Sequence, residues 1–254
     1  MGIKALKERV VELLKKDGVV FNDFDANEGG RHVNSFEPDW SMRYIYAYDD
    51  GFVHPAVFLQ MLYDPYDDHL YIFDELFEYE KETQEVCKSM MKKVYHWRQE
   101  GASTPWKQIA DTAIFANKGQ KTVASLIRMY TNINFTKSYK YDADGSLRML
   151  QGRIKNNKLT IHPRCQNTIR QYRDLTWASG DNKIEKPIDK EDDSVDLGRY
   201  VCAELNQETK PIPPPPPKPY NQKSGNHKSR FKKLIGNNVE SIDNEEKSHA
   251  WQSG

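Results

Sequence analysis

The alternation of apolar and polar positions divides the chain into a core-forming middle and polar ends. Between about Tyr44 and Val201, short apolar runs of strand length alternate with longer segments whose apolar residues recur every three to four positions. Ahead of this region, Ile3 to Leu14 has helical spacing, and Asp17-Gly18 ends the run. Roughly the last fifty residues contain few apolar side chains. The pattern therefore predicts one folded core followed by a solvated tail.

Three apolar runs in quick succession predict an antiparallel meander, at residues 44–49, 56–63 and 70–74. Downstream, helical and extended patterns alternate. The predicted helices are 79–98, 123–130, 145–154, 167–175 and 192–205, and short strands are expected at 108–111, around Phe135 and at 159–161. Antiparallel strands first, and alternating helices and strands afterwards, predict an α/β fold with a mixed sheet covered by helices on both faces.

The segment beyond the last predicted helix has a different composition. Pro213 to Pro217 are expected to form an extended, polyproline-type spacer, and a basic patch at 228–233 precedes a polar, weakly acidic end. We therefore expect three parts: an N-terminal helix and connector (1–40), a folded domain (41–206), and a Pro-rich linker with a basic, disordered tail (207–254).

Composition narrows the function classes only a little. Lysine plus arginine equals aspartate plus glutamate, at 37 each, so net charge favours no class of partner. Three widely spaced cysteines suit reduced thiols better than a disulfide framework, and neither a zinc motif nor a nucleophile motif is present. No apolar run is long enough for a signal peptide or a membrane span, so we expect a soluble, intracellular protein.

Three aspartates fall where they can carry chemistry. Asp49 ends the first predicted strand, Asp111 ends a later one, and Asp196 lies in the last helix. Hydrolysis of a phosphodiester by two magnesium or manganese ions needs several carboxylate oxygens held together, because hard divalent cations prefer oxygen ligands. The alternative is that each aspartate only forms a turn or caps a helix.

Four stretches resemble motifs of a known family. They are Tyr48-Asp49-Asp50-Gly51-Phe52, the strand Leu70 to Leu76 with its acidic end, Asp111-Thr112-Ala113, and Asp192 to Tyr200. In order and separation they are similar to the active-site motifs of the nuclease domain of phage large terminases, over roughly Gly18 to Val201. The resemblance implies a ribonuclease H-like fold and a metal-dependent endonuclease that cleaves double-stranded phage DNA during genome packaging, with two Mg²⁺ or Mn²⁺ ions.

The resemblance also implies roles for individual residues. Asp49, Asp111 and Asp196 would be the catalytic metal ligands. Asp193 stands where the family often has histidine, and it would either add a ligand or remain a solvated helix-start residue. Asp50 is expected to turn away from the site. Glu75 is expected to open the following helix rather than to approach the metal.

Cations for the DNA backbone are expected from Lys137, Lys140, Arg148 and Arg199, although an ordinary exposed loop at 136–141 is an equal alternative. The family usually carries a motor ATPase ahead of the nuclease. Here Gly119-Gln120-Lys121-Thr122 lacks the glycines of a phosphate-binding loop. We therefore expect the nuclease half alone, working in the host cytoplasm with an ATPase motor on another chain, a small terminase subunit and a portal protein.

Two other functions remain open from the sequence. One is a junction resolvase or transposase-type nuclease of the same fold, which would prefer branched DNA. The other is a non-catalytic DNA-binding assembly module of the packaging complex, for which the Pro-rich spacer and the basic patch would supply the docking surface.

Overall fold

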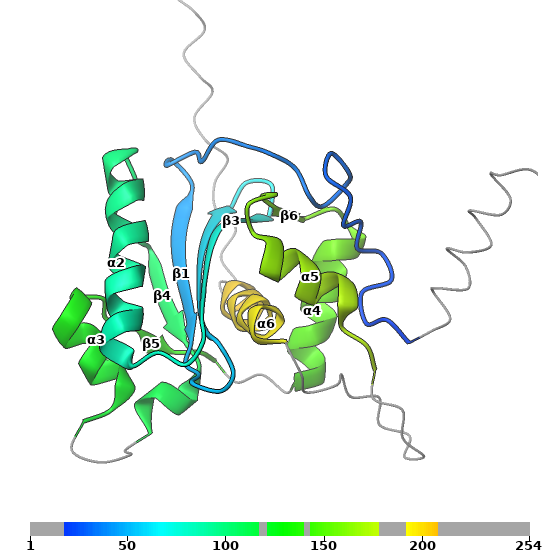
Figure 1. The fold of residues 1–254 in the computed structure, drawn as a ribbon. Helices are drawn as coiled ribbons and strands as arrows, with labels where there is room; N and C mark the ends of the chain where they lie inside the picture. Colours follow the sequence, from blue (N-terminus) through cyan, green and yellow to red (C-terminus); the bar gives the residue numbers. More distant parts are fainter. Residues whose placement is uncertain (1–17, 117–120, 140–142, 178–191, 208–254) are drawn as a thin grey trace, which may run out of the picture. The chain divides into compact units, whose positions relative to one another are not determined.

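The structure of the chain is a computed structural model that describes residues 18–116, 121–139, 143–177 and 192–207 (Figure 1). The helix expected at Ile3 to Leu14 and the linker and tail expected from residue 208 onward lie outside these described residues. None of the described helices combines the length and the apolar character that a bilayer crossing requires.

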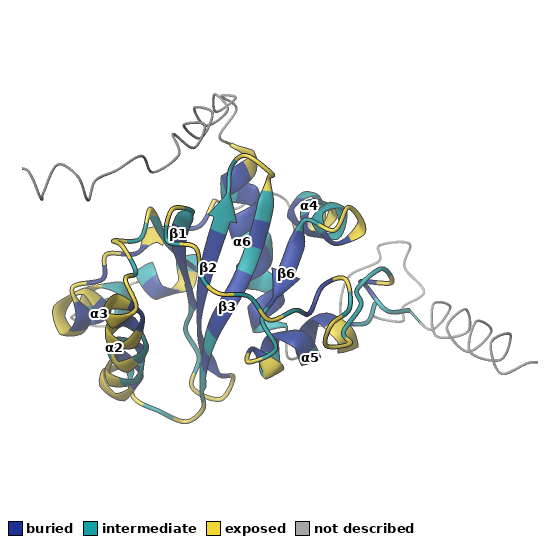
Figure 2. Cartoon of the chain, turned by 90° about the horizontal axis from the view of Figure 1, so that it is seen from above, coloured by how far each residue is buried: buried dark blue, intermediate teal, exposed yellow. Residues whose placement is uncertain are grey.

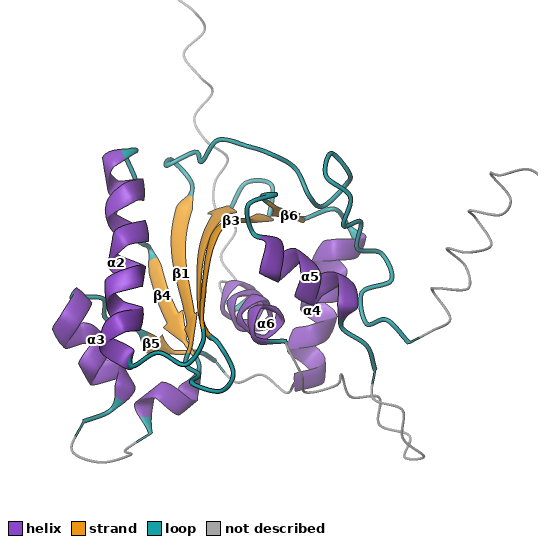
Figure 3. Cartoon of the chain, in the orientation of Figure 1, coloured by secondary structure: helices purple, strands orange, loops and turns teal. Residues whose placement is uncertain are grey.

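A six-stranded mixed sheet forms the centre of the described region (Figure 3). β1 pairs antiparallel with β2, and β2 pairs antiparallel with β3, which confirms the predicted meander. Parallel pairs join β4 to β1, β5 to β4 and β6 to β3. The order is β5-β4-β1-β2-β3-β6, with strands at Arg43–Asp49 (β1), Ala56–Asp64 (β2), His69–Glu78 (β3), Lys107–Ala110 (β4), Thr136–Lys137 (β5) and Leu159–Ile161 (β6).

Helices cover both faces of this sheet (Figures 1 and 3). On one face lie α2 (Thr83–Gln99) and α3 (Val123–Thr131). On the other lie α4 (Ala143–Lys155), α5 (Gln166–Asp174) and α6 (Asp193–Asn206), while a single 3-10 turn, η1 (Thr112–Phe115), follows β4. The predicted α/β arrangement is thus confirmed, and each predicted helix in the described region is present with slightly shifted ends.

The strands divide their side chains between two cores. In β1, Tyr44, Tyr46 and Tyr48 pack toward α2, whereas Ile45 and Ala47 pack toward α6. Both sets are almost completely buried, so the strands are dark in Figure 2 while α2 and α3 expose their outer sides. Burial on both faces explains the nearly continuous apolar runs of the sequence, because neither face of these strands meets water.

α6 crosses the middle of the second face, where it contacts β1, β2 and β4 as well as α4 and α5. Its close approach to α5 depends on Gly198, since a Cβ at this position would overlap the hydroxyl of Tyr172. This packing fixes the first turn of α6, with Asp193 and Asp196, beside the sheet.

Three details of the sequence prediction are wrong. β3 does not end at Asp74 but continues to Glu78, through a β-bulge that leaves Phe73 as the extra residue opposite β2. Glu75 does not open the following helix: its carboxylate accepts hydrogen bonds from the backbone N–H groups of Asn167 and Thr168, both at 2.9 Å, and so caps α5. The short strand starts one residue after Phe135.

Candidate active site

The topology of the sheet brings Asp49 and Asp111 to the same edge. β1 and β4 are parallel neighbours with Tyr48 paired to Ala110, and the N–H of Asp111 donates to the carbonyl of Tyr48 at 3.0 Å. The two carboxylates therefore follow adjacent parallel strands at their carboxyl ends. Because α6 packs on β1 and β4, its first turn adds Asp193 and Asp196 to the same edge. We call Asp49, Asp111, Asp193 and Asp196 the carboxylate cluster.

The charges of the other three carboxylates act on Asp49. Burial, followed by the charges of Asp111, Asp193 and Asp196, raises the pKa of Asp49 from 3.8 to about 8. A carboxyl group with such a pKa is largely protonated at neutral pH unless a cation balances its neighbours. The cluster thus has an excess of negative charge at one edge of a rigid sheet.

A tyrosine connects two members of the cluster. The hydroxyl of Tyr200 donates to Oδ2 of Asp111 at 2.8 Å and lies 3.5 Å from Oδ2 of Asp196. Burial and the nearby Asp196 raise the pKa of Tyr200, so the phenol keeps its proton and acts as the donor. The sequence contains only a weak signal for this contact, namely that Tyr200 follows Asp196 by one helical turn.

Other contacts orient the remaining carboxylates. Nη1 of Arg199 lies 3.0 Å from Oδ1 of Asp196. Nε2 of Gln171 donates to Oδ2 of Asp193 at 3.2 Å, and its Oε1 accepts from the N–H of Ser194 at 2.8 Å, which ties the start of α6 to α5. Nothing in the sequence pattern pointed to Gln171.

Asp111 and Asp49 also accept hydrogen bonds from the backbone. Oδ1 of Asp111 accepts from the N–H of Ala113 at 2.6 Å and so caps η1, and Oδ1 of Asp49 accepts from the N–H of Asp50 at 2.9 Å. The carboxylate of Asp50 accepts instead from the hydroxyl of Tyr48, at 2.7 Å, on the side of the sheet that faces α2. Asp50 is therefore turned away from the cluster.

The chemistry of the cluster fits a divalent cation, but its present geometry is not that of a loaded site. Among the described residues, no three His, Cys, Asp or Glu side chains converge closely enough to hold a metal ion. Four carboxylates are nevertheless the oxygen donors that Mg²⁺ and Mn²⁺ prefer, and the raised pKa of Asp49 shows that a positive charge would be stabilising here. Each carboxylate instead contacts a protein donor, so ion binding would require side-chain rotations.

The cations expected to bind DNA lie in different places. Lys137 is exposed on β5 and pairs with Ala110, one strand from Asp111, with its ammonium 5.6 Å from the ring centre of Phe115. Arg199 adjoins the cluster but is paired with Asp196. Arg148 is exposed on α4, in a depression that it shares with Val20. Lys140 lies outside the described residues.

Comparison with known proteins gives a consistent likeness of fold. The sequence matches no protein-family model and no curated protein. The large terminase from a thermophilic bacteriophage superposes with a TM-score of 0.61 at 20% identity, over 74% of this chain and 45% of that one. The P22 large terminase nuclease domain superposes with a TM-score of 0.60 at 14% identity, over 74% of this chain and 93% of that domain.

The chain thus spans less than half the length of the thermophilic phage's large terminase. At these identities the likeness concerns the fold. The α/β fold with a mixed sheet flanked by helices, which the sequence predicts, is confirmed, and so is its likeness in fold to terminase nuclease domains.

Proposed function

We propose that this chain is the nuclease part of a phage large terminase, a metal-dependent endonuclease that cleaves double-stranded DNA during genome packaging. The observation that carries the proposal is the carboxylate cluster, which gathers four aspartates from β1, the end of β4 and α6. Burial, followed by the charges of the other three, raises the pKa of Asp49 to about 8. Repulsion among these carboxylates lowers the stability of the sheet edge, whereas a bound cation would balance their charge. The arrangement therefore supports a cation site rather than a purely structural role.

In the proposal, Asp49, Asp111 and Asp196 hold two Mg²⁺ or Mn²⁺ ions, and Asp193 contributes a further carboxylate. When bound, the ions would activate a water molecule for attack on phosphorus and stabilise the leaving oxygen. The hydroxyl of Tyr200 positions Asp111 and Asp196, and Arg199 balances part of the charge of Asp196. Because the carboxylates lie on two strand ends and one helix, their relative positions are fixed by the fold.

DNA would approach the cluster over the edge formed by β4 and β5. Lys137 is exposed there, next to Asp111, and is proposed to contact the phosphate backbone. Arg199, Arg148 and Lys140 remain proposals as further DNA contacts, with Arg148 the most peripheral of the described ones. An ATPase motor on another chain, a small terminase subunit and a portal protein are the partners that this role implies.

A plasmid cleavage assay tests the proposal. Supercoiled plasmid is incubated with purified protein and Mn²⁺ or Mg²⁺, beside Asp49→Asn and Asp196→Asn. Asp50→Asn is the matched control, because Asp50 is adjacent in sequence but faces Tyr48. We expect nicking and linearisation by the wild type and the control, and neither by the two cluster variants nor in EDTA.

Absence of metal-dependent cutting would reject the nuclease and leave a DNA-binding assembly module. Undiminished cutting by Asp49→Asn would place the reaction elsewhere. A four-way junction offered beside linear duplex separates the remaining alternative, since a resolvase would cut the junction far more efficiently.

A further inference from the structure

We propose that Ser138 is a positioning residue of the carboxylate cluster, whose hydroxyl donates a hydrogen bond to the carboxylate of Asp111 when a divalent cation is bound. Ser138 directly follows β5 and is only 4% exposed. Its Oγ is buried and has no hydrogen-bond partner among the described residues. The inference rests on the proposed function, because it requires that the cluster binds a cation.

The pairing of β5 with β4 places Ser138 beside Asp111. The two strands are parallel with Lys137 opposite Ala110, and the N–H of Ser138 donates to the carbonyl of Ala110 at 2.9 Å. Ser138 and Asp111 are therefore the next residues along the two neighbouring chains. Because adjacent strands lie about 4.8 Å apart, two such side chains are neighbours when they point to the same face of the sheet.

Both side chains point to the face that α6 covers. Ala110 belongs to the core on the α2 side, and the ammonium of Lys137 lies 5.6 Å from the ring centre of Phe115, which packs against the same core. Successive residues of a strand alternate between the two faces, so Asp111 and Ser138 point to the opposite face. For Asp111 the hydrogen bond from Tyr200 of α6 shows this directly.

α6 holds the neighbours of Ser138 on both sides. Tyr200 donates to Asp111, the strand neighbour, at 2.8 Å. Glu204 lies one helical turn later on α6 and accepts from the N–H of Tyr139, the chain neighbour, at 2.9 Å. The hydroxyl of Ser138 is thus kept out of solvent between these two contacts, beside a carboxylate of the cluster.

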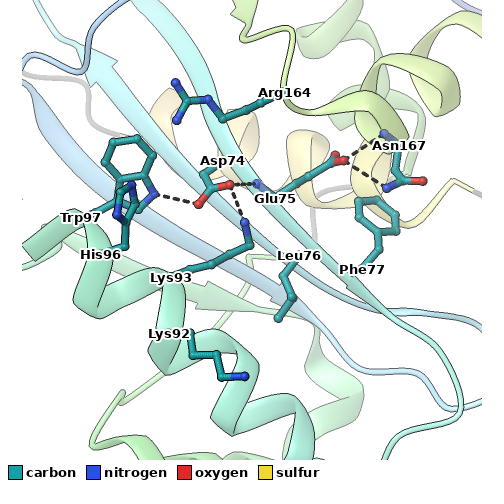
Figure 4. Close-up of a pocket in the computed structure, with 10 residues that line it drawn as sticks. All are labelled: Asp74, Glu75, Leu76, Phe77, Lys92, Lys93, His96, Trp97, Arg164 and Asn167. Atoms are coloured by element: carbon teal, nitrogen blue, oxygen red, sulfur yellow. Dashed lines mark hydrogen bonds and ion pairs between the residues drawn. The ribbon is translucent and has the colours of Figure 1, made fainter.

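A buried polar group at the outer edge of β3 differs from Ser138 in having its partners within the protein. Asp74 accepts from Nζ of Lys93 and from Nε1 of Trp97, each at 2.7 Å (Figure 4). A buried hydroxyl that forms no hydrogen bond lowers the stability of a protein, and alanine at the same position avoids that cost. The fold alone therefore gives no reason for a serine at position 138.

Cation binding would give this hydroxyl an acceptor. Oδ1 of Asp111 now accepts from the N–H of Ala113 and Oδ2 from the hydroxyl of Tyr200. Asp111 would have to give up or rearrange one of these contacts on binding a cation, and Ser138 is an adjacent donor that is not otherwise used. Carboxylates that bind metal ions are commonly held by such hydrogen bonds, and loss of one typically lowers metal affinity about 10- to 100-fold.

Titration with Mn²⁺, followed by the electron paramagnetic resonance signal of the free ion, tests this role without any cleavage reaction. We expect the dissociation constant of Mn²⁺ to be about tenfold higher for Ser138→Ala than for the wild type. In EDTA the same variant should melt about 2 to 4 °C higher than the wild type, because it no longer buries a hydroxyl without a partner.

Ser194→Ala is the matched control for the stability measurement. Ser194 is also buried, but its Oγ donates to Oε1 of Gln171 at 2.5 Å. Loss of a hydroxyl that has a partner should lower the melting temperature in EDTA, which is the opposite sign to Ser138→Ala.

Two results would overturn the inference. One is an Mn²⁺ affinity of Ser138→Ala equal to that of the wild type. The other is a lower melting temperature of Ser138→Ala in EDTA, which would show that the hydroxyl already has a structural partner in the metal-free protein.

Failure of this inference can be distinguished from failure of the proposed function. If the wild type binds Mn²⁺ and cuts plasmid while Ser138→Ala binds the ion equally well, only the role of Ser138 is wrong. If Ser138→Ala weakens Mn²⁺ binding but the wild type never cuts, the role of Ser138 stands and the nuclease does not. If the wild type binds no Mn²⁺, both proposals are wrong.

Discussion

Replacing Asp49 by asparagine should stabilise the metal-free protein at alkaline pH. In the folded chain the pKa of Asp49 is about 8, against 3.8 for an ordinary aspartate, because the side chain is buried beside Asp111, Asp193 and Asp196. A raised pKa means that this carboxyl group favours folding fully below about pH 4, and that the contribution is lost as the pH rises through about 8. Asparagine keeps the shape of the side chain and removes its titration.

The magnitude follows from the same values. At about 1.4 kcal/mol per pH unit, the free energy of unfolding of Asp49→Asn should gain about 4 kcal/mol on the wild type between pH 5 and pH 8, and then stay constant. This is a large part of the 5 to 15 kcal/mol that stabilises a typical domain. Urea denaturation of both proteins in EDTA, at several pH values, measures the difference.

Divalent cations should offset much of this loss of stability in the wild type. Mg²⁺ or Mn²⁺ at a hundredfold excess over its dissociation constant should stabilise the wild type by about 2.7 kcal/mol and leave Asp49→Asn nearly unchanged. Asp50→Asn, which faces Tyr48, should respond to the ions as the wild type does. Parallel stability curves for the wild type and Asp49→Asn from pH 5 to pH 9 would refute the electrostatic account of the cluster.

Three further predictions concern the supports of the site. Glu75→Ala should lower the free energy of unfolding by about 2 kcal/mol in urea denaturation, because it removes the cap of α5; no change would contradict the capping role. Gly198→Ala should destabilise by about 1 to 3 kcal/mol and be partly rescued by Tyr172→Phe, whereas Gly152→Ala, whose Cβ meets open space, should stabilise by about 0.5 to 1 kcal/mol. Tyr200→Phe should cut plasmid about tenfold more slowly at limiting Mg²⁺ and recover at saturation; equal rates at all concentrations would exclude its positioning role.

The sequence predicts the sheet well because both of its faces are buried. In β1 every residue from Tyr44 to Tyr48 is apolar or aromatic, and this run is visible without any knowledge of its partners. The end of β3 was not predictable in the same way. An acidic residue usually marks the end of a buried strand, yet Asp74 and Glu75 are accommodated inside β3 by donors from α2 and from the start of α5, about 20 and 90 residues away.

For the candidate site too, the sequence identifies individual residues but not the long-range contacts between them. Strand ends and helix spacing identified Asp49, Asp111 and Asp196 as candidates, but their proximity depends on the packing of α6 across β1 and β4. The supports of the cluster join residues far apart in sequence, as in Gln171 with Asp193 and Tyr200 with Asp111. The sequence next to a helical glutamine or tyrosine does not indicate such a contact.

The most direct test of the central claim is a crystal of the protein soaked in Mn²⁺ and measured for anomalous scattering. The account predicts strong anomalous peaks between the carboxylates of Asp49, Asp111 and Asp196, with the contacts of Asp111 to Ala113 or Tyr200 rearranged to admit them. Peaks elsewhere in the molecule, or an empty cluster at saturating Mn²⁺, would contradict it.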